Sequence, residues 1–235
     1  MNEADARVLV ASLFIGALVT SNLTASKVVS IEMPLIGTLM FPAAVLAYAV
    51  TFLFTDIYAE IWGKKAAGKL VIYGFFVNLF VLLLVEFAIL LPPAPFQISY
   101  QEIYANVLGS APNIILASMI AYLISQNHDV WAFHFWRKKT KGAHLWLRNN
   151  ASTLVSQLID TVLFISLAFY ILPLIIQGKP IIPLENLTTL IIGQYIVKAL
   201  IALSDTPFCY LGVILLQKSL KIEEARLLKI QVKGK

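Results

Sequence analysis

Residues Leu70–Leu91 read LVIYGFFVNLFVLLLVEFAILL, a run of 22 residues in which Glu86 is the single charged side chain. About 20 mostly apolar residues are enough for a helix to cross the hydrocarbon core of a lipid bilayer. The polar side chains Asn78 and Glu86 are too few to give this segment a water-facing side. The stretch therefore predicts a transmembrane helix.

The composition of the whole chain supports this interpretation. Of the 235 residues, 59% are apolar and 13% are charged, whereas an ordinary soluble domain has roughly 25% charged residues. A folded soluble protein of this size cannot hide so much apolar surface from water. Soluble enzymes and nucleic-acid-binding domains are thereby excluded despite the net charge of +5, and the lipid bilayer is the expected surrounding. The single cysteine, Cys209, and the three histidines argue against a disulfide framework or a metal centre, and we expect no cofactor.

Six windows of the sequence are long and apolar enough to cross a bilayer. They are Val8–Val29, Leu35–Asp56, Leu70–Leu91, Pro112–Phe135, Thr153–Ile176 and Leu187–Leu216. A short interfacial or re-entrant segment is expected around Tyr100–Leu108, and Pro207 predicts a kink or tilt in the last window. Because there is no internal repeat and no linker, we expect an all-α membrane protein with six transmembrane helices that forms a single domain over residues 1–235.

The basic residues between the windows predict the orientation. In a six-span topology one side of the membrane receives fifteen of the 18 lysines and arginines, namely Arg7, Lys64, Lys65, Lys69, Arg137, Lys138, Lys139, Lys141, Arg148, Lys218, Lys221, Arg226, Lys229, Lys233 and Lys235. Loops rich in lysine and arginine stay in the cytoplasm. We therefore expect a multi-pass protein of the cell membrane with both termini in the cytoplasm.

Polar side chains inside the windows are candidates for function, because an ionisable group in hydrocarbon is costly unless it faces a cavity or a partner. The candidates are Asn22, Asp56, Glu60, Asp129, Gln157, Asp160, Lys198 and Asp205. At a rise of 1.5 Å per residue, the acids at 56, 129 and 160 lie roughly 10–12 Å from the cytoplasmic ends of their spans, with the lysine nearer the middle.

The spacing of these residues groups them on helix faces. Asp56 and Glu60 are four residues apart, Gln157 and Asp160 are three apart, and Gln126 and Asp129 are also three apart. Gln194, Lys198 and Asp205 form a further stripe on one face. The alternative is that these groups hold helices together, with Lys198 neutralising Asp205 or Asp160. Holding helices together does not require so many acidic side chains, so we favour a ligand site over this alternative.

Five segments carry a resemblance to a known family. They are SNLTASKVV (Ser21–Val29), FPAAVLAYAVTFLFTDIYAEIWGKK (Phe41–Lys65), SQNHDVWAF (Ser125–Phe133), LWLRNNASTLVSQLIDTVLFISLAF (Leu145–Phe169) and KALIALSDTPFCY (Lys198–Tyr210). In this order they resemble the queuosine precursor transporter family, also called the vitamin uptake transporter family. The family pattern D-I-x-T-E-V-Y-G is here Asp56-Ile-Tyr-Ala-Glu60-Ile-Trp-Gly63, so both carboxylates are retained and the threonine is not.

The resemblance implies a function and an architecture. Members of the family are six-helix inner-membrane importers of 7-deazaguanine bases such as preQ0 or preQ1, which serve tRNA modification, and they are not enzymes. Their topology is similar to that of the substrate-binding subunits of energy-coupling-factor transporters. The expected partner is therefore a small-molecule 7-deazapurine, with a homodimer as an alternative to a monomer. The alternative function is import of another purine-like base or a vitamin, with an energising partner.

The candidate residues suit a guanine-like ligand. One carboxylate accepts two parallel donors, the ring N1–H and the exocyclic amine, and a lysine or amide donates to the carbonyl oxygen. Asp160 is the expected principal recognition acid, because the resemblance is densest around it. Phe164, Tyr48 and Phe52 are candidates for ring stacking, with a core role as the alternative. No nucleotide-binding loop is present in the sequence, so proton transfer by Asp160, a partner ATPase and passive uptake followed by trapping are the three alternatives for energy supply.

Overall fold

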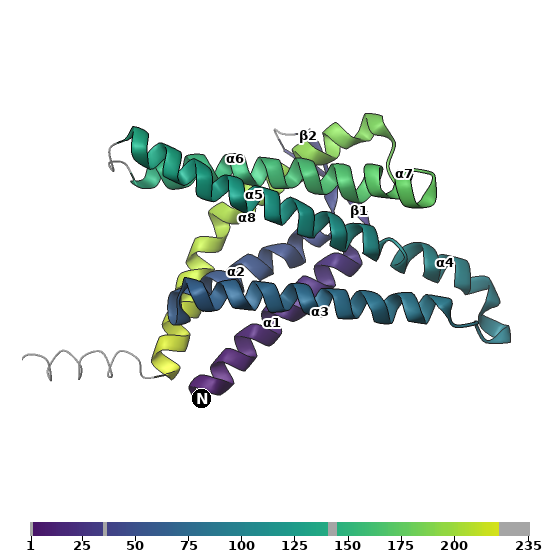
Figure 1. Ribbon diagram of the computed structural model, residues 1–235, viewed down its shortest axis with the longest axis horizontal. Helices are drawn as coiled ribbons and strands as arrows, with labels where there is room; N and C mark the ends of the chain where they lie inside the picture. Colours follow the sequence, from purple (N-terminus) through teal and green to yellow (C-terminus); the bar gives the residue numbers. More distant parts are fainter. Residues whose placement is uncertain (1, 35–36, 141–144, 221–235) are drawn as a thin grey trace, which may run out of the picture. The chain divides into compact units, whose positions relative to one another are not determined.

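The computed structural model describes residues 2–34, 37–140 and 145–220, and most of them are helical. The helices are α1 (Glu3–Thr24), α2 (Ala44–Trp62), α3 (Lys64–Leu90), α4 (Ile98–Leu108), α5 (Ala111–Lys139), α6 (Leu145–Ser166), α7 (Leu172–Gln177) and α8 (Leu184–Ser219) (Figure 1). A 3-10 turn, Pro95–Gln97, precedes α4, and a π-helical segment, Leu167–Ile171, joins α6 to α7.

The six predicted spans are confirmed in number within the described residues. Helical segments long and apolar enough to cross a membrane are Glu3–Thr24, Ala44–Trp62, Lys65–Leu90, Pro95–Ser125, Leu154–Gln177 and Leu184–Ile201. The segment around Tyr100–Leu108 lies in the helix α4, and its expected interfacial or re-entrant position stays a prediction. The Gln101 side-chain amide donates to the carbonyl oxygen of Ile89 at 2.9 Å. Pro207 lies inside the continuous helix α8.

The boundary between the first two spans was predicted wrongly. The windows Val8–Val29 and Leu35–Asp56 predicted helix at Val28, Val29 and residues 37–42. Residues Val28–Met33 and Gly37–Pro42 instead form antiparallel strands β1 and β2, with Val28 opposite Pro42 and Met33 opposite Gly37. An apolarity window cannot separate a short apolar strand from a helix, whereas the β-branched residues of β1 and the prolines around them favour extended backbone. Gly37 has φ +86°, a left-handed conformation that glycine adopts without steric cost.

The contacts of the chain fall into two compact units, each described here by itself. Unit 1 comprises Met1–Ser21, Leu46–Phe80 and Lys198–Lys235, and unit 2 comprises Asn22–Val45 and Val81–Val197. The unit boundaries fall inside helices. The single domain expected from the sequence stays a prediction.

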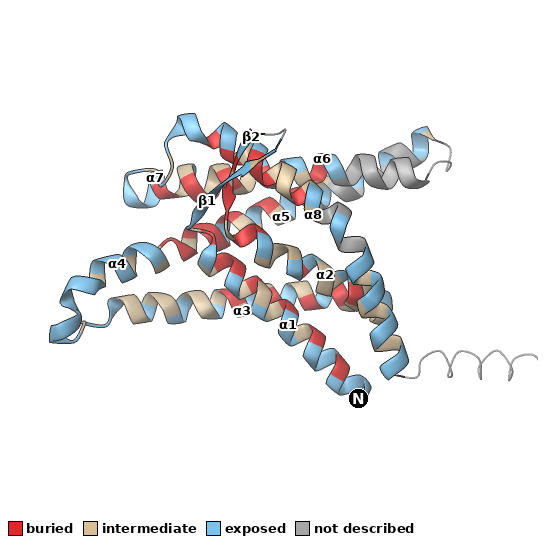
Figure 2. Cartoon of the chain, turned by 180° about the vertical axis from the view of Figure 1, so that it is seen from behind, coloured by how far each residue is buried: buried red, intermediate tan, exposed pale blue. Residues whose placement is uncertain are grey.

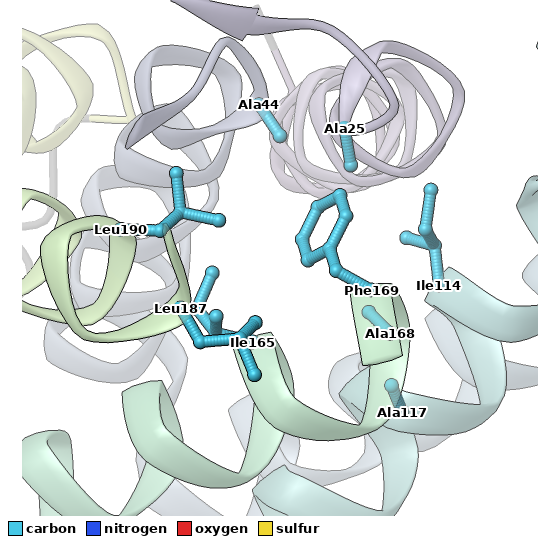
Figure 3. Close-up of a cluster of buried hydrophobic side chains, with 9 residues drawn as sticks. All are labelled: Ala25, Ala44, Ile114, Ala117, Ile165, Ala168, Phe169, Leu187 and Leu190. Carbon is cyan, nitrogen blue, oxygen red and sulfur yellow. The ribbon is translucent and has the colours of Figure 1, made fainter. Parts of the chain in front are cut away.

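Unit 2 has a hydrophobic core built around Phe169. The cluster consists of Ala25, Ala44, Ile114, Ala117, Ile165, Ala168, Phe169, Leu187 and Leu190 (Figure 3). The Phe169 ring projects from the π-helical segment towards Ala25 and Ala44 and is fully buried. Within unit 2, the helices α5 and α6 lie side by side (Figure 1). Between helices in a bilayer such a cluster stabilises the contact through van der Waals packing.

The π-helical segment has an identifiable cause. Pro173 has no backbone N–H, so it cannot donate to the carbonyl oxygen of Phe169 four residues earlier. That oxygen instead accepts hydrogen bonds from the backbone N–H groups of Ile181 and Ile182, at 2.9 and 3.2 Å. The loop after α7 is thereby attached to the helix at the level of the buried ring.

The hairpin packs closely on α8 within unit 2. A Cβ atom placed on Gly193 of α8 would collide with the backbone carbonyl of Met40 in β2. Only glycine permits this approach of helix to strand. Figure 2 shows the result in burial: β2 is largely buried towards its end, where Phe41 and Pro42 lie, whereas β1 is mostly exposed.

Candidate functional site

In unit 2, polar side chains connect α5 and α6. The Ser125 hydroxyl lies 3.4 Å from a carboxylate oxygen of Asp160, and His128 Nδ1 lies 3.0 Å from the Ser156 hydroxyl. His128 follows Ser125 by one turn of α5, and Ser156 precedes Asp160 by one turn of α6. We call these four residues the α5–α6 polar row. It places a carboxylate, an imidazole and two hydroxyls on one helix–helix contact.

The neighbours of Asp160 on α6 differ in their freedom to bind a ligand. Thr161 is fully buried, and its hydroxyl donates to the carbonyl oxygen of Gln157 at 2.8 Å, so it is committed to its own helix. The Gln157 side chain is half-buried, as is that of Asp160. Asn22, in the last turn of α1, is buried at 6% exposure. These residues supply acceptors and amide donors of the kind a heterocyclic base requires.

In unit 1 the notable group is Lys198. Its side chain is buried, and Nζ lies 5.5 Å from the centroid of the Tyr48 ring. That distance is within the range of a cation–π interaction, which is stronger where water is excluded. The backbone of α2 is also tied locally, because the Thr51 hydroxyl donates to the Tyr48 carbonyl oxygen at 2.6 Å. Lys198 therefore has an aromatic partner, Tyr48, that could not be predicted from the residue spacing in the sequence.

The remaining candidates are placed as follows. Asp56 and Glu60 lie one turn apart on α2, and both are exposed. Asp129 lies in α5 and Asp205 in α8, but their side chains fall outside the described residues, as does that of Gln126. The expected stripe of Gln194, Lys198 and Asp205 can be followed only for its first two members, which are both buried.

Sequence reasoning missed Asn113. This residue lies in the first turn of α5, at the edge of its window, and its side chain is buried at 1% exposure. The signal available was an amide directly after Pro112 in an otherwise apolar segment. His128 was not among the candidate residues either; its ring lies 5.8 Å from the Trp131 ring and also faces Ser156 across the helix contact.

Metal chemistry finds no support in these residues. Within the described part of the chain, no three histidine, cysteine or acidic side chains come together as ligands of one ion would. The available chemistry is hydrogen bonding and charge complementarity inside an apolar helix bundle, which suits reversible binding of a small polar molecule.

Comparison with known proteins agrees with this chemistry. Residues 42–212 match the family model described as "Putative vitamin uptake transporter". A relative from Bacillus subtilis (strain 168), named "Probable queuosine precursor transporter", is 32% identical over 164 residues, which cover 69% of this chain and 67% of the relative. No solved structure matches the chain. The protein belongs to the vitamin uptake transporter family and is a membrane transporter, not an enzyme.

Proposed function

We propose that the protein imports a queuosine precursor base of the 7-deazaguanine type, such as preQ0 or preQ1, across the inner membrane for use in tRNA modification. The observation that carries the proposal is the kinship over two thirds of both chains with a relative named a queuosine precursor transporter. The buried polar groups agree with it, because a planar base with several donors and acceptors is well recognised by fixed carboxylate and amide groups in an apolar surrounding.

In this proposal Asp160 accepts the two donors of the guanine-like edge. Its half-buried position beside the Ser125 hydroxyl supports the role, since a carboxylate there is held by a neighbour yet still accessible. Lys198, Asn22, Gln157, Asp56, Glu60, Asp129 and Asp205 complete the proposed set of binding residues.

Uptake by living cells tests the substrate. Cells unable to make 7-deazaguanine bases and expressing the protein should accumulate labelled preQ1 or preQ0, and unlabelled guanine-like bases should compete. The same cells without the protein serve as the control for diffusion and background binding. Accumulation of a vitamin or an unrelated base in place of the deazapurine would replace the proposed substrate and leave the transporter assignment intact. Dissipating the proton gradient in the same cells tests whether uptake is proton-coupled.

The proposed orientation has both termini in the cytoplasm, as in the substrate-binding subunits of energy-coupling-factor transporters. It rests on the asymmetric distribution of lysine and arginine between the loops. In a Cys209→Ser background, a cysteine at the exposed position Ser99 should react with an impermeant maleimide added outside the cell. A cysteine at the exposed position Lys65 should react only after permeabilisation. The reverse pattern would invert the topology.

A further inference from the structure

The hydroxyl group of Ser125 lies near two hydrogen-bond acceptors. In its own helix, α5, the backbone carbonyl oxygen of Tyr122 is 3.2 Å away, and across the helix contact a carboxylate oxygen of Asp160 is 3.4 Å away. Ser125 is buried, at 8% exposure. A hydroxyl group has one proton to donate, so in this position the two oxygens share it or receive it in turn.

A second serine of the same helix shows what the hydroxyl does without a charged neighbour. Ser118 lies two turns before Ser125 on α5, and its hydroxyl donates to the carbonyl oxygen of Ile115 at 2.9 Å. A bond of this kind, to a carbonyl three or four residues earlier, is the usual one for a serine inside a helix. At Ser125 the corresponding bond is longer, and both of its contacts exceed the usual length of about 2.8 Å for O–H···O bonds. These distances agree with a proton that is divided between helix and carboxylate.

The position of Ser125 opposite Asp160 is held by a second contact between the same helices. One turn further along the row, His128 Nδ1 of α5 lies 3.0 Å from the Ser156 hydroxyl of α6. That contact does not depend on the protonation of the imidazole, because a serine hydroxyl can either donate or accept. Two cross-helix contacts one turn apart fix how α5 and α6 sit along each other. The Ser125 hydroxyl is therefore kept within reach of the carboxylate.

The donor matters because a bidentate contact depends on the direction of the carboxylate plane. The last torsion of an aspartate side chain has broad preferences, so the plane turns easily unless a neighbour holds it. An ionised carboxylate has about four acceptor positions on its two oxygens. A bond from Ser125 uses one of them and leaves a position on each oxygen of Asp160 for two parallel donors. Hydrogen bonds in an empty site are often long and tighten when the ligand is bound.

We propose that Ser125 is a positioning residue that fixes the plane of the Asp160 carboxylate for the two donors of a guanine-type base. The inference rests on the proposed function, in which Asp160 accepts the ring N–H and the exocyclic amine. Two parallel bonds form together only when the plane is correct, whereas a single bond tolerates a turned carboxylate. Ser125 thereby supports the preference for a base with both donors over a base that has the ring N–H alone.

The test compares two bases on the full-length protein in lipid nanodiscs. Calorimetry measures the affinity for 7-deazaguanine, which has both donors, and for 7-deazahypoxanthine, which lacks the exocyclic amine. We expect Ser125→Ala to bind 7-deazaguanine about fivefold more weakly and 7-deazahypoxanthine almost as before, so that the preference between the bases declines. The matched control is Ser118→Ala, which removes a hydroxyl of the same helix that donates to its own backbone and should change neither affinity.

A double-mutant cycle separates positioning from a structural role. In an Asp160→Ala background, which has no carboxylate to orient, Ser125→Ala should cause no further loss of affinity. A further loss there would overturn the inference and make Ser125 a packing residue of the α5–α6 contact. Equal weakening for both bases in Ser125→Ala, or an unchanged preference between them, would also overturn it. A wild type that binds neither base would overturn the proposed function and this inference with it, a result distinct from the others.

Discussion

Lys198→Met is expected to abolish uptake while leaving a folded protein in the membrane. The ammonium group is buried and lies 5.5 Å from the Tyr48 ring centroid. A buried cation requires partners that offset the free-energy cost of its removal from water. Such partners most often belong to a functional site. Methionine keeps the length and the packing of the stem but loses the charge. The loss of one charge-assisted contact to a ligand or an acid corresponds to a decrease in affinity of about tenfold to a hundredfold.

Two further variants separate the charge from its surroundings. Lys218→Met removes a lysine from the last turn of the same helix, where the side chain is exposed, and should transport normally. Tyr48→Phe keeps an aromatic face under the ammonium group and should retain most of the activity, whereas Tyr48→Leu should not. Normal uptake by Lys198→Met would show that the lysine only packs in the helix bundle and would remove the main cation from the proposed site.

The sequence predicts the number of spans because apolar length is a local property. Leu70–Leu91 and its counterparts satisfy the length requirement whatever they pack against. The hairpin of Val28–Pro42 was missed because its residues are as apolar as those of the spans. What distinguishes it is its pairing of strands and its packing on Gly193, and both are tertiary features.

The candidate site, like the fold, could be predicted from the sequence only in part. The sequence singles out Asp160 and Lys198 as polar residues in apolar segments, and the structure shows that Lys198 is buried. The partners come from elsewhere in the chain: Ser125 is 35 residues from Asp160, and Tyr48 lies on a different helix from Lys198. Nothing in the local sequence gives these pairings, because they depend on which helices become neighbours. Buried amide atoms without a hydrogen-bond partner, such as Nδ2 of Asn113 and Oε1 of Gln194, could not be predicted from the sequence at all. A missing contact can be recognised only when every neighbour of the atom is known.

Asp160→Asn is expected to weaken binding of a 7-deazaguanine base by tenfold or more, with about 1.5–3 kcal/mol for the charge-assisted bonds lost. An ionised carboxylate accepts two parallel hydrogen bonds, whereas an asparagine offers one acceptor and one donor, so one of the two contacts becomes repulsive. The Ser125 hydroxyl, 3.4 Å from the carboxylate, can still donate to the asparagine oxygen, so the α5–α6 contact should persist. Asp160→Glu should also fail, because one added methylene shifts the carboxylate by about 1 Å in a preformed site.

In the alternative interpretation Asp160 carries protons. The affinity of the Asp160→Asn variant for the base distinguishes this role from recognition of the base. A proton carrier replaced by asparagine would lose coupled accumulation in cells and keep its affinity for the base in the purified protein. A recognition residue would lose both. Calorimetry on the purified Asp160→Asn variant across a range of pH therefore decides, with Glu102→Gln, an exposed carboxylate on α4, as the control for loss of one negative charge. Unchanged affinity in Asp160→Asn would reject recognition by this residue and move the search for the binding acid to Asp129 and Asp56.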